Sequence, residues 1–175
     1  MKRLSVFIIC TLFAMANIFA QSAKSDLEKA QKSGKSIYLV VTDKAAKGAD
    51  ALEKIANDAN KKSKNTAVIK LDRDDKANAD LVSKYRLAGA PLPLVLVVAS
   101  NGVVSGSIDY ANATTEKLIS FLPSKTQADV LLGFENGKAA LIVCGKKNAK
   151  DKEAIETECK NAMTSLGNKA TQVFV

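Results

Sequence analysis

The side chains best suited to covalent chemistry in this sequence are its three cysteines, because the chain contains no histidine. Cys144 ends an apolar run and is followed by Gly145, Lys146 and Lys147. A thiol beside ammonium groups at a helix N-terminus has a lowered pKa and reacts as a thiolate. Cys144 is therefore a candidate for monothiol exchange or thiol tethering. A buried, unreactive thiol at a strand end explains the same residues, and the sequence leaves both interpretations open.

Cys159 lies four residues from both Ile155 and Met163, which places the three side chains on one helix face. This spacing predicts a small buried side chain rather than a nucleophile. A disulfide between Cys144 and Cys159 would need their Cα atoms within about 7 Å. At about 1.5 Å per residue, the helix carries Cys159 roughly 12 Å from its start. The sequence therefore disfavours this bridge.

The third cysteine, Cys10, lies in an N-terminal segment that has the composition of a secretory signal peptide. Lys2 and Arg3 are followed by an apolar run and then by small residues up to Ala20. This pattern predicts a signal peptide over residues 1–20 that is removed after Ala20, and hence a periplasmic or secreted protein. The apolar run is too short for a transmembrane segment.

The net charge of +8 comes from lysines and arginines spread along the chain and mixed with acidic residues. The chain has three tyrosines and no tryptophan, and no arginine cluster interleaves with aromatic residues. This composition argues against nucleic-acid binding. The acidic stretch at 72–80 lacks the glycine and terminal glutamate of a calcium loop. We therefore expect no cofactor and no metal.

Apolar periodicity predicts alternating helices and strands through the first two thirds of the mature chain. Ser25 can cap the first helix and Gly34 ends it. The predicted order is helix 25–34, strand 37–41, helix 47–62, strand 66–71, helix 78–85, strand 94–100, strand 103–108 and helix 114–121. Strands connected through helices pair in parallel, which predicts an α/β fold.

Two prolines, Pro91 and Pro93, lie at the start of the most apolar strand, and an Asn101-Gly102 turn follows it. Proline cannot donate a hydrogen bond to a sheet, so its presence here is unusual. A cis peptide bond in a tight turn is one explanation. Pro93 is adjacent to the strand and is favoured for the cis bond, although the spacing from Tyr85 favours Pro91.

The order of strand, acidic turn, helix ending in Tyr85, proline turn, strand, Asn-Gly turn and strand resembles the C-terminal half of a thioredoxin domain. The resemblance implies a three-layer α/β/α sandwich over residues 22–122. In redox-active members a Cys-x-x-Cys motif opens the long helix, where it performs dithiol exchange. Here Thr42-Asp43-Lys44-Ala45 takes the place of that motif.

Neither Thr42 nor Asp43 replaces the missing cysteines. The hydroxyl of Thr42 has no general base nearby and is a poor nucleophile. Asp43 is predicted to cap the long helix rather than to act as a base. We therefore expect no dithiol redox activity and no enzyme of that class.

What the resemblance leaves is a peptide-docking edge. In relatives, the residue before the cis proline offers its backbone to an extended peptide, a form of β-addition. That residue is Leu92 if Pro93 is cis, or Ala90 if Pro91 is. The predicted peptide-binding residues are Leu92, Pro93, Thr42 and Asp43. The alternative is that the proline turn serves only the fold.

Residues 126–175 repeat the beginning of the domain. Shifting the sequence by 103 residues superposes Gly34-Lys35 on Gly137-Lys138 and Leu52 on Ile155 without a gap. This predicts a partial second thioredoxin-like unit with the order α-β-α-β. Its uncovered strand edges would be satisfied by packing on the first domain and extending its sheet, by pairing with another copy in a homo-oligomer, or by further residues of a longer chain.

Together these observations predict an exported thioredoxin-like protein without dithiol activity, which acts as a peptide- or protein-binding, chaperone-like module. The alternative function is a monothiol oxidoreductase or thiol-tethering protein that uses Cys144.

Overall fold

The computed structural model describes residues 22–143 and 150–174. The first part of the chain folds in the order α1 (Ala23–Lys32), β1 (Ser36–Thr42), α2 (Ala49–Lys62), β2 (Thr66–Asp72), η1 (Lys76–Asn78), α3 (Ala79–Lys84), β3 (Leu94–Val98), β4 (Val104–Asp109), η2 (Tyr110–Asn112) and α4 (Thr115–Ser120). The second part continues with α5 (Lys125–Glu135), β5 (Ala139–Val143), α6 (Lys152–Leu166), η3 (Gly167–Lys169) and β6 (Ala170–Phe174).

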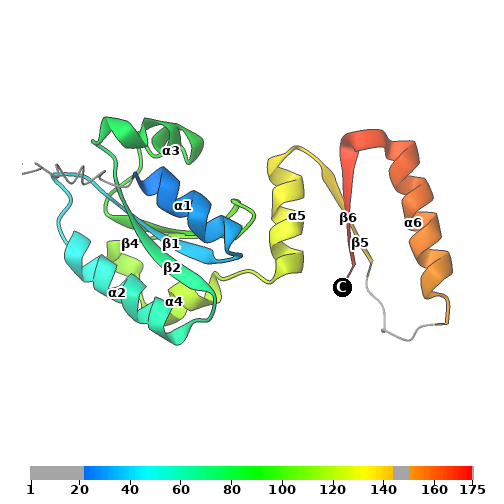
Figure 1. Cartoon of the computed structure of the whole chain (residues 1–175), viewed down its shortest axis with the longest axis horizontal. Helices are drawn as coiled ribbons and strands as arrows, with labels where there is room; N and C mark the ends of the chain where they lie inside the picture. Colours follow the sequence, from blue (N-terminus) through cyan, green and yellow to red (C-terminus); the bar gives the residue numbers. More distant parts are fainter. Residues whose placement is uncertain (1–21, 144–149, 175) are drawn as a thin grey trace, which may run out of the picture.

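The first part is built on a four-stranded mixed sheet in the order β2-β1-β3-β4. Strand β1 pairs with β2 in parallel and with β3 antiparallel, so that Leu39 lies between Ile69 and Leu96. Helices α1 and α3 cover one face of the sheet, and α2 and α4 cover the other (Figure 1). A mixed sheet of this order between two helical layers is the thioredoxin-like α/β/α architecture that the resemblance predicted.

The unbroken apolar runs of β1 and β3 follow from this position, because both faces of the central strands are covered. Alternate side chains of β1 enter different cores: Leu39 packs on the side of α1 and α3, and Val40 packs on the side of α2 and α4. Every residue of β3 is buried. The sheet is therefore a rigid base for the loops at its ends.

The first helix begins two residues earlier than predicted, at Ala23, and its cap lies three residues earlier. Its N-cap is Ser22, whose hydroxyl accepts a hydrogen bond from the Ser25 amide, so Ser25 is the capped residue and not the cap. Both serines fit the capping preference, and only the start of the helix distinguishes them. Gly34 lies beyond the C-cap at φ 70°, where glycine is favoured.

The second part forms its own two-stranded parallel sheet, β5-β6, and does not extend the first sheet. Helix α5 lies between the two parts (Figure 1). Its buried residue Ala128 packs with Ala99 and Val103 of the β3–β4 turn, and the Asn101 amide group donates to the Ala128 carbonyl at 2.8 Å. Of the three alternatives for the second part, extension of the first sheet is wrong, because the two sheets remain separate and the contact is made by helix α5.

Of the two cysteines that follow the predicted signal peptide, the structure describes one. Cys144 lies outside the described residues. Cys159 is a free thiol on α6 and is only partly buried. The prediction of a buried Cys159 is wrong. No residue of α6, which is described over its whole length, is buried, because the helix covers a sheet of only two strands. Among the described residues, no helix is long and apolar enough to cross a membrane.

Candidate functional site

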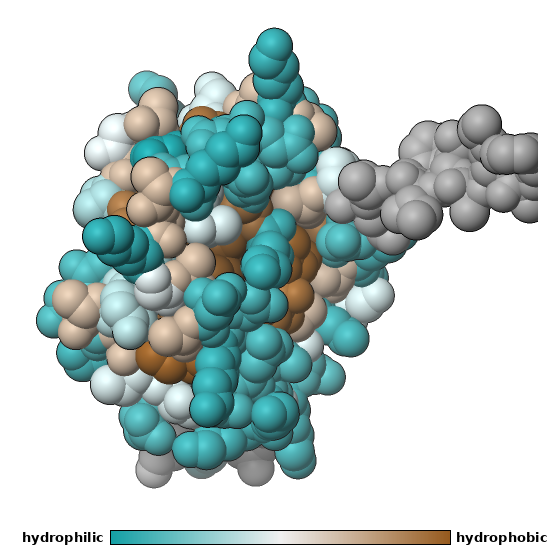
Figure 2. All heavy atoms as spheres, turned by 90° about the vertical axis from the view of Figure 1, so that its left-hand side faces the viewer, coloured by the Kyte–Doolittle hydropathy of each residue, from teal (hydrophilic) through white to brown (hydrophobic). Residues whose placement is uncertain are grey.

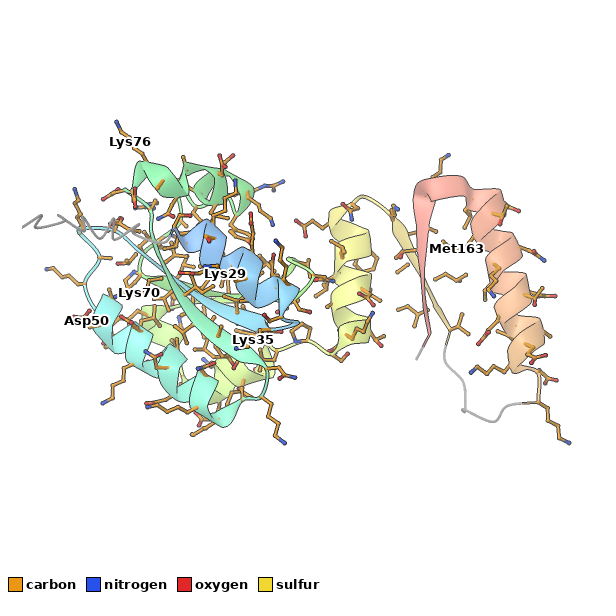
Figure 3. All side chains as sticks on the ribbon, viewed as in Figure 1. Lys29, Lys35, Asp50, Lys70, Lys76 and Met163 are labelled. Atoms are coloured by element: carbon orange, nitrogen blue, oxygen red, sulfur yellow. The ribbon has the colours of Figure 1, made fainter. Side chains whose placement is uncertain are left out.

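The predicted peptide-binding residues gather at one end of the first sheet. Strands β1 and β2 finish there, α2 begins there, and the turn before β3 crosses the same end. Asp50 of α2 and Lys76 of η1 lie on opposite sides of this end (Figure 3). Viewed end-on, apolar atoms are recessed between hydrophilic side chains (Figure 2).

The place expected for the cysteine motif is a loop rather than a helix start. Residues 43–48 separate β1 from α2, whose N-cap is Gly48 at φ 87° with no side-chain cap. Asp43 therefore does not cap α2, and that prediction is wrong because the loop carries its carboxylate away from the helix. The carboxylate instead accepts a hydrogen bond from the Ala45 amide at 3.0 Å. Thr42 is half-buried, and its hydroxyl donates to the Asp43 carbonyl.

Arg73 connects the Asp43 loop to the turn before Pro93. One guanidinium nitrogen forms an ion pair with the Asp43 carboxylate. Another donates to the carbonyl oxygens of Leu87 at 3.2 Å and Ala90 at 2.9 Å. The side chains of Arg73 and Asp43 are 22% and 12% exposed, so solvent screens this pair less than a surface pair.

Sequence reasoning missed Arg73, which it counted only as part of an acidic turn. The signal present in the sequence was its residue type, because the chain has only three arginines among many lysines. Arginine suits a site that needs several hydrogen bonds in a fixed plane, which a lysine cannot provide. Its partners lie 14 to 30 residues away along the chain, so no local pattern identifies them.

The Leu92–Pro93 peptide bond is cis. Pro93 is buried, and its carbonyl accepts a hydrogen bond from the Tyr110 amide at 3.1 Å. Leu92 is half-buried, and its side chain packs against the core on the side of α1 and α3. No group among the described residues forms a hydrogen bond with the backbone N–H or C=O of Leu92.

Charged and titratable groups around the site are held in place by local contacts. Asp75 caps η1, and Asp80 forms an ion pair with Lys24, which holds the pKa of Asp80 below its usual value. Behind the site, burial raises the pKa of Tyr85 to about 12, and Glu135 adds to the rise. Tyr85 is therefore neutral near pH 7. Among the described residues, no group of acidic or cysteine side chains could hold a metal ion.

Comparisons with solved structures find similar folds at low sequence identity. A disulphide isomerase from Xylella fastidiosa Temecula1 is 21% identical, with 62% of this chain and 90% of that chain covered and a TM-score of 0.42. A DsbH oxidoreductase is 13% identical, with 58% and 81% covered and a TM-score of 0.42. The first two thioredoxin domains of Saccharomyces cerevisiae Eps1p are 14% identical, with 87% and 72% covered and a TM-score of 0.45. No protein-family model and no curated protein matches the chain.

Replacing Arg73 by methionine should destabilise the first domain by about 3 kcal/mol, because it leaves the mostly buried Asp43 carboxylate without its partner. Urea unfolding measures this change. Arg86→Met is the matched control: Arg86 is exposed and has no ion pair among the described residues, so its effect should stay within about 0.5 kcal/mol.

The double variant Asp43→Leu with Arg73→Met should be more stable than Arg73→Met alone, because no unpaired charge remains buried. Equal urea midpoints for Arg73→Met and the wild-type protein would contradict the role given to this ion pair.

Proposed function

We propose that this protein is exported and that it binds an extended segment of a peptide or another protein at Leu92, without dithiol exchange. The observation that carries the proposal is the free backbone N–H and C=O of Leu92 beside a held turn. An extended chain can satisfy both groups at once by adding to this edge, as in other forms of β-addition.

The contacts of Arg73 support this proposal because they fix the turn before a ligand arrives. Ala90, two residues before Leu92, is held through its carbonyl, and Pro93, directly after it, is held by the Tyr110 amide. A binding edge that is already ordered loses less conformational entropy when a ligand binds. The Leu92 backbone is thus presented by contacts on both sides of it.

The absence of dithiol chemistry rests on the residues at the same end. No cysteine occurs between positions 11 and 143. At the residues that the sequence aligns with the motif, the Asp43 carboxylate is paired with Arg73, and α2 begins six residues later without a cysteine. A paired carboxylate cannot exchange disulfides, and it fits a site that binds without reacting.

Backbone N-methylation of a ligand tests strand addition without changing the protein. We expect a fluorescein-labelled hexapeptide of alternating threonine and phenylalanine to bind. In a series of peptides with one N-methyl group each, the affinity should fall at every second position only, because successive N–H groups of a strand point in opposite directions. Fluorescence anisotropy measures the affinity. The absence of binding by any peptide of this kind, or an N-methyl effect without alternation, would count against the proposal.

Export is supported by the N-terminal pattern of two basic residues, an apolar run and small residues up to Ala20. We expect the protein recovered outside the cytoplasm to begin at Gln21. Intact-mass measurement of that fraction checks this. A full-length chain beginning at Met1 in the cytoplasm would contradict it.

The second part of the chain is proposed to associate with a second copy. Ile142 and Ile155 are 50% and 45% exposed, whereas their counterparts in the repeat, Leu39 and Leu52, are fully buried. In the first domain β3 and α4 help to bury these positions. Among the described residues, no strand pairs with the free edge of β5, and a β5 strand from a second copy could pair there antiparallel.

Sedimentation equilibrium tests this association. The wild-type protein should form a dimer at micromolar concentration, and Ile142→Ser should shift it to monomer because less apolar surface is buried between the copies. Lys150→Ser, a change of an exposed residue on the same part of the chain, is the control. A wild-type protein that stays monomeric at all concentrations would rule the association out.

A further inference from the structure

The residue next to the proposed peptide edge that sequence reasoning missed is Tyr110. It is the first residue of η2, and its amide hydrogen bond to the Pro93 carbonyl places its backbone beside the Leu92–Pro93 turn. Its ring lies against Gly48, the N-cap of α2: a Cβ added at Gly48 would be 2.5 Å from Cε1 of the ring and 2.7 Å from Cδ1. Tyr110 thus connects the proline turn to the start of α2.

The ring of Tyr110 is exposed although one side of it lies against Gly48. Tyr110 is 41% exposed, and no other large apolar residue between positions 22 and 122 is exposed to this degree. The contact with Gly48 covers part of the ring and leaves the rest open to solvent. Aromatic side chains held in this way carry much of the binding energy at protein interfaces, because little side-chain freedom remains to be lost.

Strand addition at Leu92 brings a ligand side chain towards this ring. Successive side chains of an extended peptide point to opposite faces of the sheet. One face is the side of α1 and α3, where Leu92 packs. The other is the side of α2, where the ring of Tyr110 lies on Gly48. Side chains at every second position of the added strand therefore lie on the face that carries Tyr110, where one of them can reach the ring.

We infer that Tyr110 determines which peptides this site accepts, by contacting an apolar, preferably aromatic, side chain on every second position of a strand paired with Leu92. This inference rests on the proposed peptide site. Gly48 has a part in it, because only a residue without a Cβ lets the ring lie over the start of α2. The ligand class is an extended peptide with an aromatic residue among polar ones.

A phenylalanine scan through a labelled polar hexapeptide of serine and threonine tests the inference by fluorescence anisotropy. The wild-type protein should bind peptides with phenylalanine at alternate positions about two- to tenfold more tightly than the peptide with none. Tyr110→Ala should remove this preference, and Tyr110→Phe should keep it. Gly48→Ala should also remove it, because its Cβ displaces the ring without deleting it. Since φ is 87° at this position, circular dichroism must first show that this variant is folded. Phe134→Ala, which changes an exposed aromatic residue on α5, should leave the preference unchanged.

The outcomes separate this inference from the proposal on which it rests. If Tyr110→Ala is folded by circular dichroism and keeps the wild-type preference, Tyr110 does not select the ligand, although peptide binding at Leu92 stands. If no peptide binds the folded wild-type protein, the peptide site itself is absent and both statements fail. If Tyr110→Ala does not fold, the other two variants decide the question. The inference stands if Gly48→Ala loses the preference for phenylalanine and Tyr110→Phe keeps it, and it fails if both variants keep it.

Discussion

The ion pair between Arg73 and Asp43 is the interaction on which the functional end of this fold depends. Asp43 follows β1 directly and Arg73 follows β2 directly, so the parallel pairing of these strands brings the two residues together. Once paired, the guanidinium group has donors left for the carbonyl oxygens of Leu87 and Ala90. The conformation of the proline turn before β3 is therefore coupled to the pairing of β1 with β2.

The pair lies at one end of a thioredoxin-like fold whose residues 11–143 contain no cysteine. Directly after β1 this chain has a carboxylate, Asp43, that is neutralised by Arg73. The pair neutralises the Asp43 carboxylate, and the backbone N–H and C=O of Leu92 have no hydrogen-bond partner among the described residues. In the proposed function this end of the sheet binds an extended chain, with the ring of Tyr110 beside it.

The sequence predicted the fold well because the signals that specify it are local. The apolar run of β1, the periodicity of α2 and the proline turn before β3 each identify their own element. The order of elements predicted the parallel pairing of β1 with β2, but it was wrong for β3, which pairs antiparallel with β1. Leu92 could be found in the same way, from its place beside Pro93. Arg73 could not, because its partners are up to 30 residues away and meet it only in the folded chain.

The wrong predictions for Asp43 and Cys159 had a common physical origin. Whether a residue caps a helix or is buried depends on where the helix begins and on what covers it. Asp43 has the right residue type for a helix cap, but α2 starts only at Ala49. Cys159 has the spacing of a buried position, but the sheet under α6 has only two strands to cover it. Tyr110 was missed for a related reason, since its contact with Gly48 joins two loops that are distant in sequence.

The measurement that tests the central claim most directly is a ¹⁵N–¹H correlation spectrum of the protein during addition of an unlabelled alternating threonine–phenylalanine peptide. Binding at the proposed edge predicts the largest shift for the Leu92 amide, with further shifts at Tyr110 and in the 44–48 loop, and none along α6. Shifts confined to β5 and α5, or a spectrum that does not change at millimolar peptide, would contradict the claim that this end of the first sheet is a peptide-binding site.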